Sequence, residues 1–298
     1  MVEYETLLSD VSQLPLKARR RTLRLFWKAL QITGNLPASG VADMLKYVLH
    51  LSTAEATRIE EETLYQDLIV SAEWIAIMKR DRKGLEKDVR AISIPEQDLL
   101  KEVSRSGKPL IFAPLHMGCF ALPFAKIMFD HFSDRRMLIL RAREDRPAET
   151  MAMQRISEMG VDMRFLNIHH KQNYFDAVQF AKEGAVIVMF IDLPGSYGGA
   201  VRVDFFDKPI RLAMGIGSLA RLTGAAVIPL YVHSSVSGDV VNIGRVFETY
   251  EKGPDEKARV ASIVRRHIED SIRFSPEQWH MWPRFHEYLD MGQGEEAA

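Results

Sequence analysis

The sequence KPLIFAPLHMGCFAL, residues 108–122, places an apolar run directly before a histidine and a glycine. The run 109–113 predicts a buried β-strand, and His116 and Gly118 follow Pro114 at the predicted start of a helix. In α/β proteins, ligands bind beyond the carboxyl ends of the parallel strands. Histidine is also the side chain whose ordinary pKa suits proton transfer near neutral pH. We therefore expect His116 to lie in a functional site.

The segments on both sides of this stretch also show a pattern of strands and helices. From residue 84 onward, short apolar runs rich in β-branched residues alternate with amphipathic segments, which predicts an α/β fold with a mostly parallel sheet flanked by helices. The predicted strands are 109–113, 136–140, 162–166, 185–191, 226–232 and 240–246. The predicted helices are 96–106, 117–129, 148–159, 173–182, 210–222 and 255–273, and Ser275-Pro276-Glu277-Gln278 predicts a capping box that opens a further short helix.

The sequence divides into three regions. Residues 1–83 show helical spacing of apolar residues, interrupted by turn-forming residues between Gly34 and Gly40, and predict an N-terminal helical region. Residues 84–291 carry the α/β pattern and predict the main domain. We expect the tail 292–298 to be disordered.

The composition limits the classes of function. The 298 residues are 47% hydrophobic, which is enough for a large globular core. The formal net charge of -1 gives no overall attraction to polyanions, so nucleic acid is not an expected partner. The single cysteine, Cys119, excludes an internal disulfide and fits a reducing compartment. No apolar run reaches the roughly 20 residues of a membrane-spanning helix, and the N-terminus does not have the pattern of a signal peptide.

Residues 11–42 contain no aspartate or glutamate but several lysines and arginines. On a helix, Lys17, Arg21, Arg24 and Lys28 would share one face, and apolar residues including Trp27 would lie on or near the other. Such a basic amphipathic helix over residues 17–30 is suited to lie on an anionic membrane surface. A helix that packs on the rest of the protein, with its basic face in water, would give the same pattern. Both interpretations are open at this point.

Three motif matches do not carry a site by themselves. Gly215-x-Gly217-x-x-Ala220 has the letters of a dinucleotide fingerprint, but it falls inside a predicted helix instead of a strand-to-helix turn. His169 and His170 are adjacent, so their side chains diverge, and no acidic partner at a metal-ligand spacing accompanies them. Ser196 lacks the nucleophile-elbow context and fits a turn serine. We therefore expect neither a metal ion nor a bound cofactor.

A series of short motifs runs in order from about Lys108 to Tyr288. It comprises His116-Met117-Gly118 after an apolar strand, then Arg141, Arg155, Asp192, Val203-Asp204-Phe205-Phe206-Asp207-Lys208-Pro209, Ser275-Pro276-Glu277-Gln278-Trp279 and Arg284-Phe285. This series resembles the bacterial lipid A biosynthesis acyltransferases, which belong to the lysophospholipid acyltransferase superfamily. The resemblance implies a fold of the glycerol-3-phosphate acyltransferase type. It also implies transfer of a fatty acyl group from an acyl thioester to a hydroxyl of a membrane lipid.

The resemblance further implies partners and a location. The acyl donor would be a thioester of acyl carrier protein or coenzyme A, which is a co-substrate, and no other cofactor is implied. The protein would act in the cytoplasm, as a peripheral protein at the cytoplasmic face of the inner membrane, in lipid biosynthesis.

The implied reaction needs a base, because a hydroxyl is a weak nucleophile at neutral pH. The resemblance assigns that role to His116. In the family, a glutamate or aspartate follows the histidine by five residues and orients its ring, whereas this sequence has Ala121 at that position. The usual pair of histidine and acid is therefore absent from the motif itself.

Three interpretations follow from Ala121. In the first, an acid elsewhere orients His116, and Asp192 is the leading candidate because it ends a predicted parallel strand at the same edge of the sheet. In the second, His116 acts without an acid on an amine, which needs less help from a base than a hydroxyl does. In the third, the protein is a non-catalytic relative that binds an acyl chain or a lipid headgroup, or acts as a partner subunit. An acyl-enzyme on Cys119 is a weaker alternative, because a free cysteine is usually a small core side chain.

Five further residues are candidates for substrate binding. Arg141 and Arg155 match landmarks of the family, and arginine forms bidentate contacts with phosphates such as those of phosphopantetheine or a lipid headgroup. Gly118 belongs to the same motif as His116. Phe205 and Phe206 would either border a groove for the acyl chain or fill the hydrophobic core.

Overall fold

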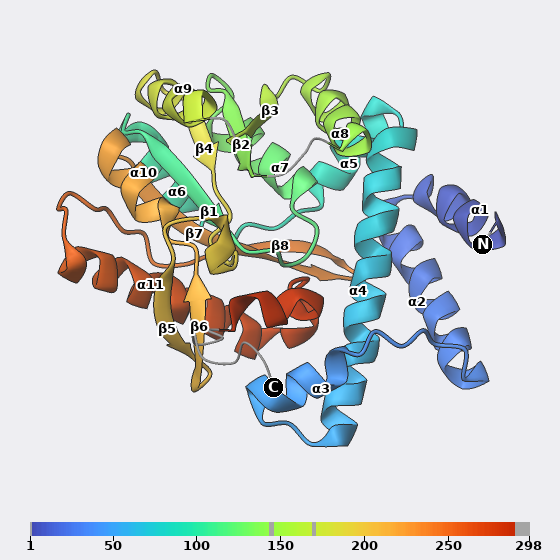
Figure 1. Cartoon of the computed structure of the whole chain (residues 1–298). Helices are drawn as coiled ribbons and strands as arrows, with labels where there is room; N and C mark the ends of the chain where they lie inside the picture. Colours follow the sequence, from blue (N-terminus) through green and yellow to red (C-terminus); the bar gives the residue numbers. More distant parts are fainter. Residues whose placement is uncertain (1, 143–145, 169–170, 290–298) are drawn as a thin grey trace.

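The computed structural model describes residues 2–142, 146–168 and 171–289, and a six-stranded β-sheet lies at its centre (Figure 1). The strands are β1 (Leu110–Pro114), β2 (Met137–Arg141), β3 (Met163–Asn167), β4 (Val186–Val188), β7 (Ala226–Ser235) and β8 (Gly238–Ile243). Their order is β3-β2-β4-β1-β7-β8, and each neighbouring pair is parallel except β7 with β8. The predicted class, a mostly parallel sheet flanked by helices, is confirmed.

Helices cover both faces of the sheet. On one face lie α5 (Arg82–Arg90), α6 (Gln97–Arg105), α7 (Ala121–His131) and α8 (Pro147–Ser157). On the other lie α9 (Lys171–Lys182), α10 (Gly215–Thr223) and α11 (Pro254–Phe274). Alternate residues of β1 explain this arrangement, because successive side chains of a strand point to opposite faces. Leu110 and Phe112 join the hydrophobic cluster of α5–α8, whereas Ile111 and Ala113 join that of α9–α11.

The predictions for residues 200–222 are partly wrong. A hairpin of β5 (Val201–Phe205) and β6 (Lys208–Leu212) forms a separate antiparallel sheet that the apolar runs do not predict. The helix predicted at 210–222 begins only at Gly215, because residues 208–212 pair with β5. β5 lacks a continuous apolar run, because the charged and exposed residues Arg202 and Asp204 alternate with its apolar ones. This alternation is the pattern of a strand with one face in water.

The capping box predicted at residues 275–278 is also wrong. The segment forms the short 3₁₀ turn η2 (Pro276–Gln278), and a second one, η3 (Trp282–Tyr288), follows. Ser275 makes no capping hydrogen bond, and its hydroxyl instead bonds to His233 Nδ1 at 3.0 Å.

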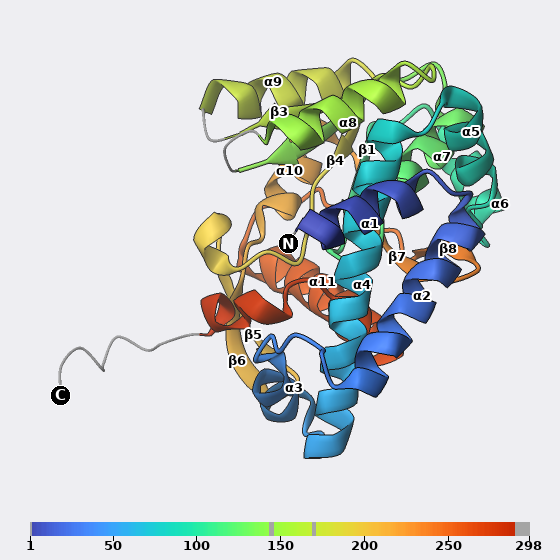
Figure 2. The ribbon, with the colours of Figure 1, turned by 90° about the vertical axis from the view of Figure 1, so that its right-hand side faces the viewer.

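Four helices form the N-terminal region, namely α1 (Val2–Ser12), α2 (Leu16–Thr33), α3 (Val41–Leu49) and α4 (Thr53–Lys79). Helix α4 opens with a capping box made by Ser52 and Glu55. Figures 1 and 2 show α4 between the α/β part of the molecule and helices α1 and α2. The apolar side of α2 is inside the protein, where Leu23 and Trp27 are buried and the Trp27 ring lies 6.0 Å from that of Tyr65 on α4. This side of the helix is therefore not available to a membrane.

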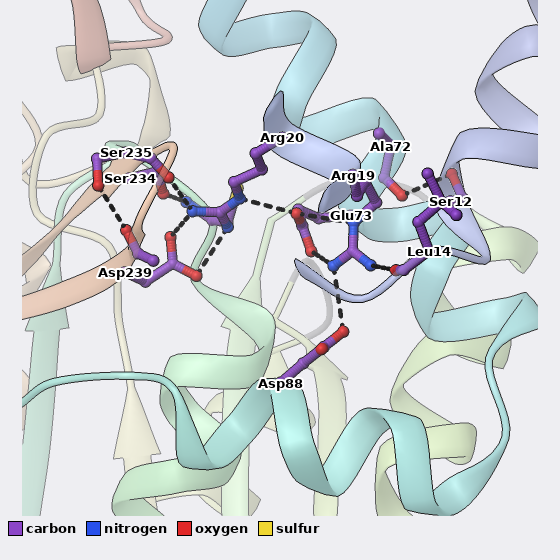
Figure 3. Close-up of polar contacts among 12 residues, drawn as sticks. Ser12, Leu14, Arg19, Arg20, Ala72, Glu73, Asp88, Ser234, Ser235 and Asp239 are labelled. Atoms are coloured by element: carbon purple, nitrogen blue, oxygen red, sulfur yellow. Dashed lines mark hydrogen bonds and ion pairs between the residues drawn. The ribbon is translucent and has the colours of Figure 1, made fainter. Parts of the chain in front are cut away.

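Two arginines of α2 are buried in a network of ion pairs (Figure 3). Arg19 Nη2 lies 2.6 Å from Glu73 Oε2 and 3.2 Å from Asp88 Oδ2. Arg20 Nε lies 2.9 Å from Glu73 Oε1, and its Nη1 lies 2.8 Å from Asp239 Oδ1. Burial alone would raise the pKa of Glu73, but the two guanidinium groups hold it below its usual value. The network ties α2, α4 and α5 to the β7–β8 hairpin.

The opposite side of α2 is exposed to water. Arg24, which is predicted to belong to it, instead pairs with Glu62 at 2.8 Å and lies over the Tyr65 ring at 3.5 Å. Two large apolar side chains stand out on the exposed side, Leu25 at 69% and Ile32 at 87% exposure. We call the exposed set of residues the solvent face of α2, and it consists of Lys17, Ala18, Arg21, Leu25, Lys28, Ala29, Ile32 and Thr33.

Some of the predictions from the sequence concern residues that the structure does not describe. His169, His170 and the tail 292–298 lie outside the described ranges. The predicted boundary between residues 83 and 84 falls inside α5. Within residues 2–142, 146–168 and 171–289, no helix is long and apolar enough to cross a bilayer. The same residues contain no group of three or more His, Cys, Asp or Glu side chains that could hold a metal ion.

Candidate active site

Beyond β1 the chain runs through a loop, 116–120, before α7 begins at Ala121. The helix predicted from Met117 therefore starts four residues later than expected. Gly118 has a φ of 61°, a left-handed conformation that an α-helix does not contain. A Cβ on Gly118 would lie 2.5 Å from the Val232 carbonyl oxygen, so this close approach of two backbone segments requires glycine.

A short antiparallel bridge holds this loop against the C-terminal segment. Met117 pairs with Trp279. On either side of the pair, the Gly118 amide donates to the Gln278 carbonyl at 3.4 Å, and the His280 amide donates to the His116 carbonyl at 2.9 Å. The backbone around His116 is thereby fixed by residues more than 150 positions away in the sequence.

The register of two parallel strands brings His116 and Asp192 together. Phe112 pairs with Val188, and the two functional candidates each lie four positions further along. Strand β4 ends at Val188, but the residues after it still donate hydrogen bonds to β1. His116 Nδ1 lies 2.8 Å from Asp192 Oδ1, and the His116 amide donates to Asp192 Oδ2 at 2.7 Å. The carboxyl edge of the sheet therefore carries a histidine in direct contact with an acid.

Asp192 is fully buried, yet its surroundings favour the carboxylate. Burial alone would raise its pKa, but the His116 ring, the His116 amide and the Trp279 indole hold the pKa of Asp192 below its usual value. Trp279 Nε1 donates to Oδ2 at 2.9 Å. A carboxylate at Nδ1 fixes the ring tautomer, so that Nδ1 carries the hydrogen and Nε2 is the nitrogen that can accept a proton. The ring also stacks on Phe190, with centroids 4.1 Å apart.

His116 lines a pocket with a volume of about 340 Å³. Its walls are largely apolar, and three arginines, Arg141, Arg146 and Arg284, also line it. A mostly apolar pocket with a few polar groups is typical of small-molecule sites. The apolar lining residues include Val70, Trp74, Ile139, Leu140, Phe165, Ile168, Met189, Phe190 and Leu193. The pocket thus combines a base, an apolar wall and cationic side chains.

One protein family matches the sequence over most of its length. The family described as bacterial lipid A biosynthesis acyltransferase matches residues 6–287 of the 298. The chain belongs to this family. The match includes the N-terminal helices, which the motifs from about Lys108 to Tyr288 do not cover. Among curated proteins, none matches the chain significantly.

Membership of an acyltransferase family makes the position of Ala121 informative. Ala121 opens α7 and is buried in the hydrophobic cluster of the α5–α8 face. The position five residues after His116 is therefore occupied by a core side chain and not by an acid. In this family member the carboxylate in contact with His116 comes from Asp192, 76 residues further along the chain.

Cys119 has the environment of a core residue. Its side chain is buried, and burial raises the pKa of the thiol above its usual value. Its amide donates to Ser234 Oγ at 2.9 Å. Because the thiolate is the nucleophilic form, a buried neutral thiol is a poor candidate for an acyl-enzyme intermediate.

The two arginines predicted to bind substrate lie in different places. Arg141 lines the pocket, with its guanidinium 4.0 Å from the centre of the Phe165 ring and Nη1 3.6 Å from Glu149 Oε2. Arg155 does not line the pocket. Its Nη1 lies 2.7 Å from Glu158, and its Nη2 donates to the Arg80 carbonyl at 3.1 Å, just after the end of α4.

Gly118, Phe205 and Phe206 do not line this pocket either. Gly118 shapes the loop that carries His116. Phe205 is 1% exposed and packs among aromatic rings that include Trp279. The guanidinium carbon of Arg273 lies over the Phe206 ring, 4.8 Å from the centre of that ring. Of the two uses predicted for these phenylalanines, the core is the one that Phe205 fulfils.

Some residues of the site are not singled out by the sequence. Phe190 is the second-last residue of the predicted strand 185–191. The apolar pattern of that strand predicts a core residue there and gives no indication of a site residue. Trp279 and Arg284 belong to motifs shared with the family, which was a usable signal. Arg284 Nη2 donates to the Tyr197 hydroxyl at 3.0 Å beside the pocket. His280 has no sequence signal.

Proposed function

We propose that this member of the family transfers a fatty acyl group from an acyl thioester to an acceptor, with His116 as general base. The observation that carries the proposal is the 2.8 Å contact between His116 Nδ1 and Asp192 Oδ1 at the edge of the pocket. Nε2 of His116 takes the proton of the acceptor as the acceptor attacks the thioester carbonyl. Asp192 orients the ring and balances the charge that the ring gains.

The donor is a thioester of acyl carrier protein or coenzyme A. Two features of the pocket support this assignment. Its apolar wall suits an acyl chain. Arg141 also lines the pocket, and its guanidinium group can form bidentate contacts with a phosphate such as that of phosphopantetheine.

The acceptor is a hydroxyl rather than an amine. An amine would be the easier acceptor for a histidine without an acid beside it, but the His116 ring is in contact with Asp192. A hydroxyl needs the stronger base assistance that an oriented histidine gives.

The place of action is the surface of an anionic membrane, which would contain a lipid acceptor. The solvent face of α2 supports this part of the proposal, since Lys17, Arg21 and Lys28 lie on it together with the exposed Leu25 and Ile32. No acidic residue lies between positions 11 and 42 to offset these charges.

The test is an acyl-transfer assay with purified protein. Acyl carrier protein and coenzyme A thioesters are offered with hydroxyl acceptors, including a lipid A precursor, and with amines. His116→Ala should abolish transfer, whereas the matched variant of an exposed histidine, His286→Ala, should not. Binding of acyl lipid without any transfer by the wild type would instead identify a non-catalytic relative. Transfer to amines alone would contradict the assignment of the acceptor.

A further inference from the structure

A second histidine lies directly opposite His116 on the antiparallel bridge. Because Met117 pairs with Trp279, the next residues outward, His116 and His280, also face each other across the two segments. Opposed residues of an antiparallel pair project to the same side, with Cβ atoms roughly 5 Å apart. Both residues line the same pocket. Met117 and Trp279 point the other way and are buried in the core.

His280 repeats the arrangement of His116 with an acid of its own. Its Nδ1 lies 2.8 Å from Asp67 Oδ1, on helix α4 of the N-terminal region. The side chain of His280 is 20% exposed and that of Asp67 is 50% exposed. The pocket is therefore bordered by two histidines, each anchored through Nδ1 by a carboxylate.

The remaining ring nitrogen of His280 has no hydrogen-bond partner among the described residues. Nε2 is buried, and no described residue forms a hydrogen bond with it. Because His280 lines the pocket, a substrate bound there can supply the partner for this nitrogen. The backbone amides of Gly118 and Cys119, in the neighbouring loop, already donate to Gln278 and Ser234. Neither amide is therefore free to donate a hydrogen bond to a ligand in the pocket.

We propose that His280, held by Asp67, is a second catalytic residue that delivers a proton to the sulfur of the departing thiol. This inference rests on the proposed function. As the acceptor oxygen forms its bond to the acyl carbon, its proton moves to His116 Nε2. Unlike His116, His280 must begin the cycle with a proton on Nε2 in addition to the Nδ1–H that it donates to Asp67. As the bond between carbon and sulfur breaks, the Nε2 proton moves to sulfur and leaves the His280 ring neutral. One proton then passes from His116 to His280, which restores both rings, so that an ester and a free thiol are the net products.

The dependence on the leaving group separates this role from a structural one. The variants His280→Asn and His280→Gln are compared with the wild type, using an alkyl thioester of coenzyme A and an aryl thioester of the same acyl chain. An aryl thiolate departs readily without a proton. We expect kcat with the alkyl thioester to fall by about 10²-fold, the usual contribution of a general acid, and kcat with the aryl thioester to fall by less than about tenfold. Asp67→Asn should show the same pattern to a smaller degree.

The controls keep the two proposals apart. His286→Gln, an exposed histidine nearby in the sequence, should leave both rates unchanged, and circular dichroism checks that each variant is folded. Equal losses with both thioesters, or unchanged rates with an active wild type, would overturn the role of His280 and leave the proposed function standing. An inactive wild type would overturn both.

Discussion

The Nδ1 atom of His116 lies 2.8 Å from the fully buried carboxylate of Asp192, and the two residues occupy equivalent positions beyond the ends of two neighbouring parallel strands. The contact joins residues that are 76 positions apart in the sequence. Because the two residues come from different strands, their geometry depends on the register of the whole sheet instead of on the local turn.

Replacement of Asp192 by Asn should lower kcat by about 10⁴-fold, by analogy with the serine-protease triad, because an amide does not balance the charge of the protonated ring and can select the wrong tautomer. Steady-state kinetics with an acyl thioester measures the effect. Asp134→Asn, an exposed aspartate at the opposite end of the sheet, is the control and should keep full activity. A fall of only a few-fold for Asp192→Asn would mean that the acid does not act through His116.

Replacement of Cys119 by Ser should leave turnover largely intact, because the buried thiol is neutral and does not form an acyl intermediate. Loss of a true nucleophile costs on the order of 10⁶-fold in kcat in a serine protease. Mass spectrometry of the wild type during turnover should find no acylated Cys119. A covalent adduct there, together with an inactive variant, would contradict this expectation.

Replacement of Gly118 by Ala should reduce activity on the order of 10²-fold, because the new Cβ would lie 2.5 Å from the Val232 carbonyl and force the loop of His116 to move. Gly224→Ala provides a matched control. Gly224 has a similar φ of 65°, but nothing lies within 4 Å of the added Cβ. Its backbone strain costs about 1 kcal/mol, and its activity should be retained. Equal kinetic effects of the two variants would rule out the steric explanation.

Replacement of Glu73 by Gln should lower the free energy of unfolding by about 3 kcal/mol or more, because Arg19 and Arg20 lose their shared buried anion. Urea denaturation measures the change. Glu62→Gln removes the partner of Arg24 in a pair that is partly exposed, and it should cost less than about 1 kcal/mol. Similar costs for the two variants would contradict the special role of burial.

The same carboxyl group makes stability depend on pH. The folded protein holds the pKa of Glu73 below its usual value despite burial, so its contribution is fully present above the unfolded value of about 4.3 and is lost as pH falls through the folded value. Between neutral pH and about pH 3, the wild type should therefore lose more stability than Glu73→Gln does. A parallel decline of both proteins would mean that Glu73 does not titrate in this way.

The variant Lys17→Gln, Arg21→Gln, Lys28→Gln should bind anionic vesicles about 10²-fold more weakly, since each basic residue at such a surface contributes about 1 kcal/mol. Sedimentation with phosphatidylglycerol vesicles measures this. The control removes three exposed basic residues from α5, Lys83, Lys87 and Arg90, which carry the same total charge. Equal weakening by both variants would indicate a general charge effect and not a specific face of α2.

The sheet could be predicted from the sequence because its strands are buried on both faces and form apolar runs such as residues 109–113. The β5–β6 hairpin could not be predicted in this way, because Arg202 and Asp204 interrupt the pattern and Pro209 lies within a strand. The charge pattern of α2 predicts that Arg24 lies on an exposed face. It does not predict the ion pair of Arg24 with Glu62, because that contact depends on how α2 packs on α4.

The part of the site that depends on the order of the parallel strands could be predicted from the sequence. Asp192 is expected beside His116 because both follow parallel strands, and the structure has them in contact. Position 280 was not predictable, because His280 and its acid, Asp67, are 213 residues apart and meet only when α4 packs on the C-terminal segment. Its motif alone predicts substrate binding for Arg155, which does not line the pocket and whose Nη2 donates to the Arg80 carbonyl.

Helix α4 has a consequence for shortened forms of this protein. It carries Asp67 and the pocket residues Val70 and Trp74, and it also carries Glu73 of the ion-pair network. A truncated chain that begins at residue 84 would thus lack one wall of the pocket and would leave Asp88 and Asp239 buried without their arginines. Exchange of N-terminal regions between relatives should therefore succeed only when the partners of these arginines, Asp88 on α5 and Asp239 on the β7–β8 hairpin, are exchanged together with the helices.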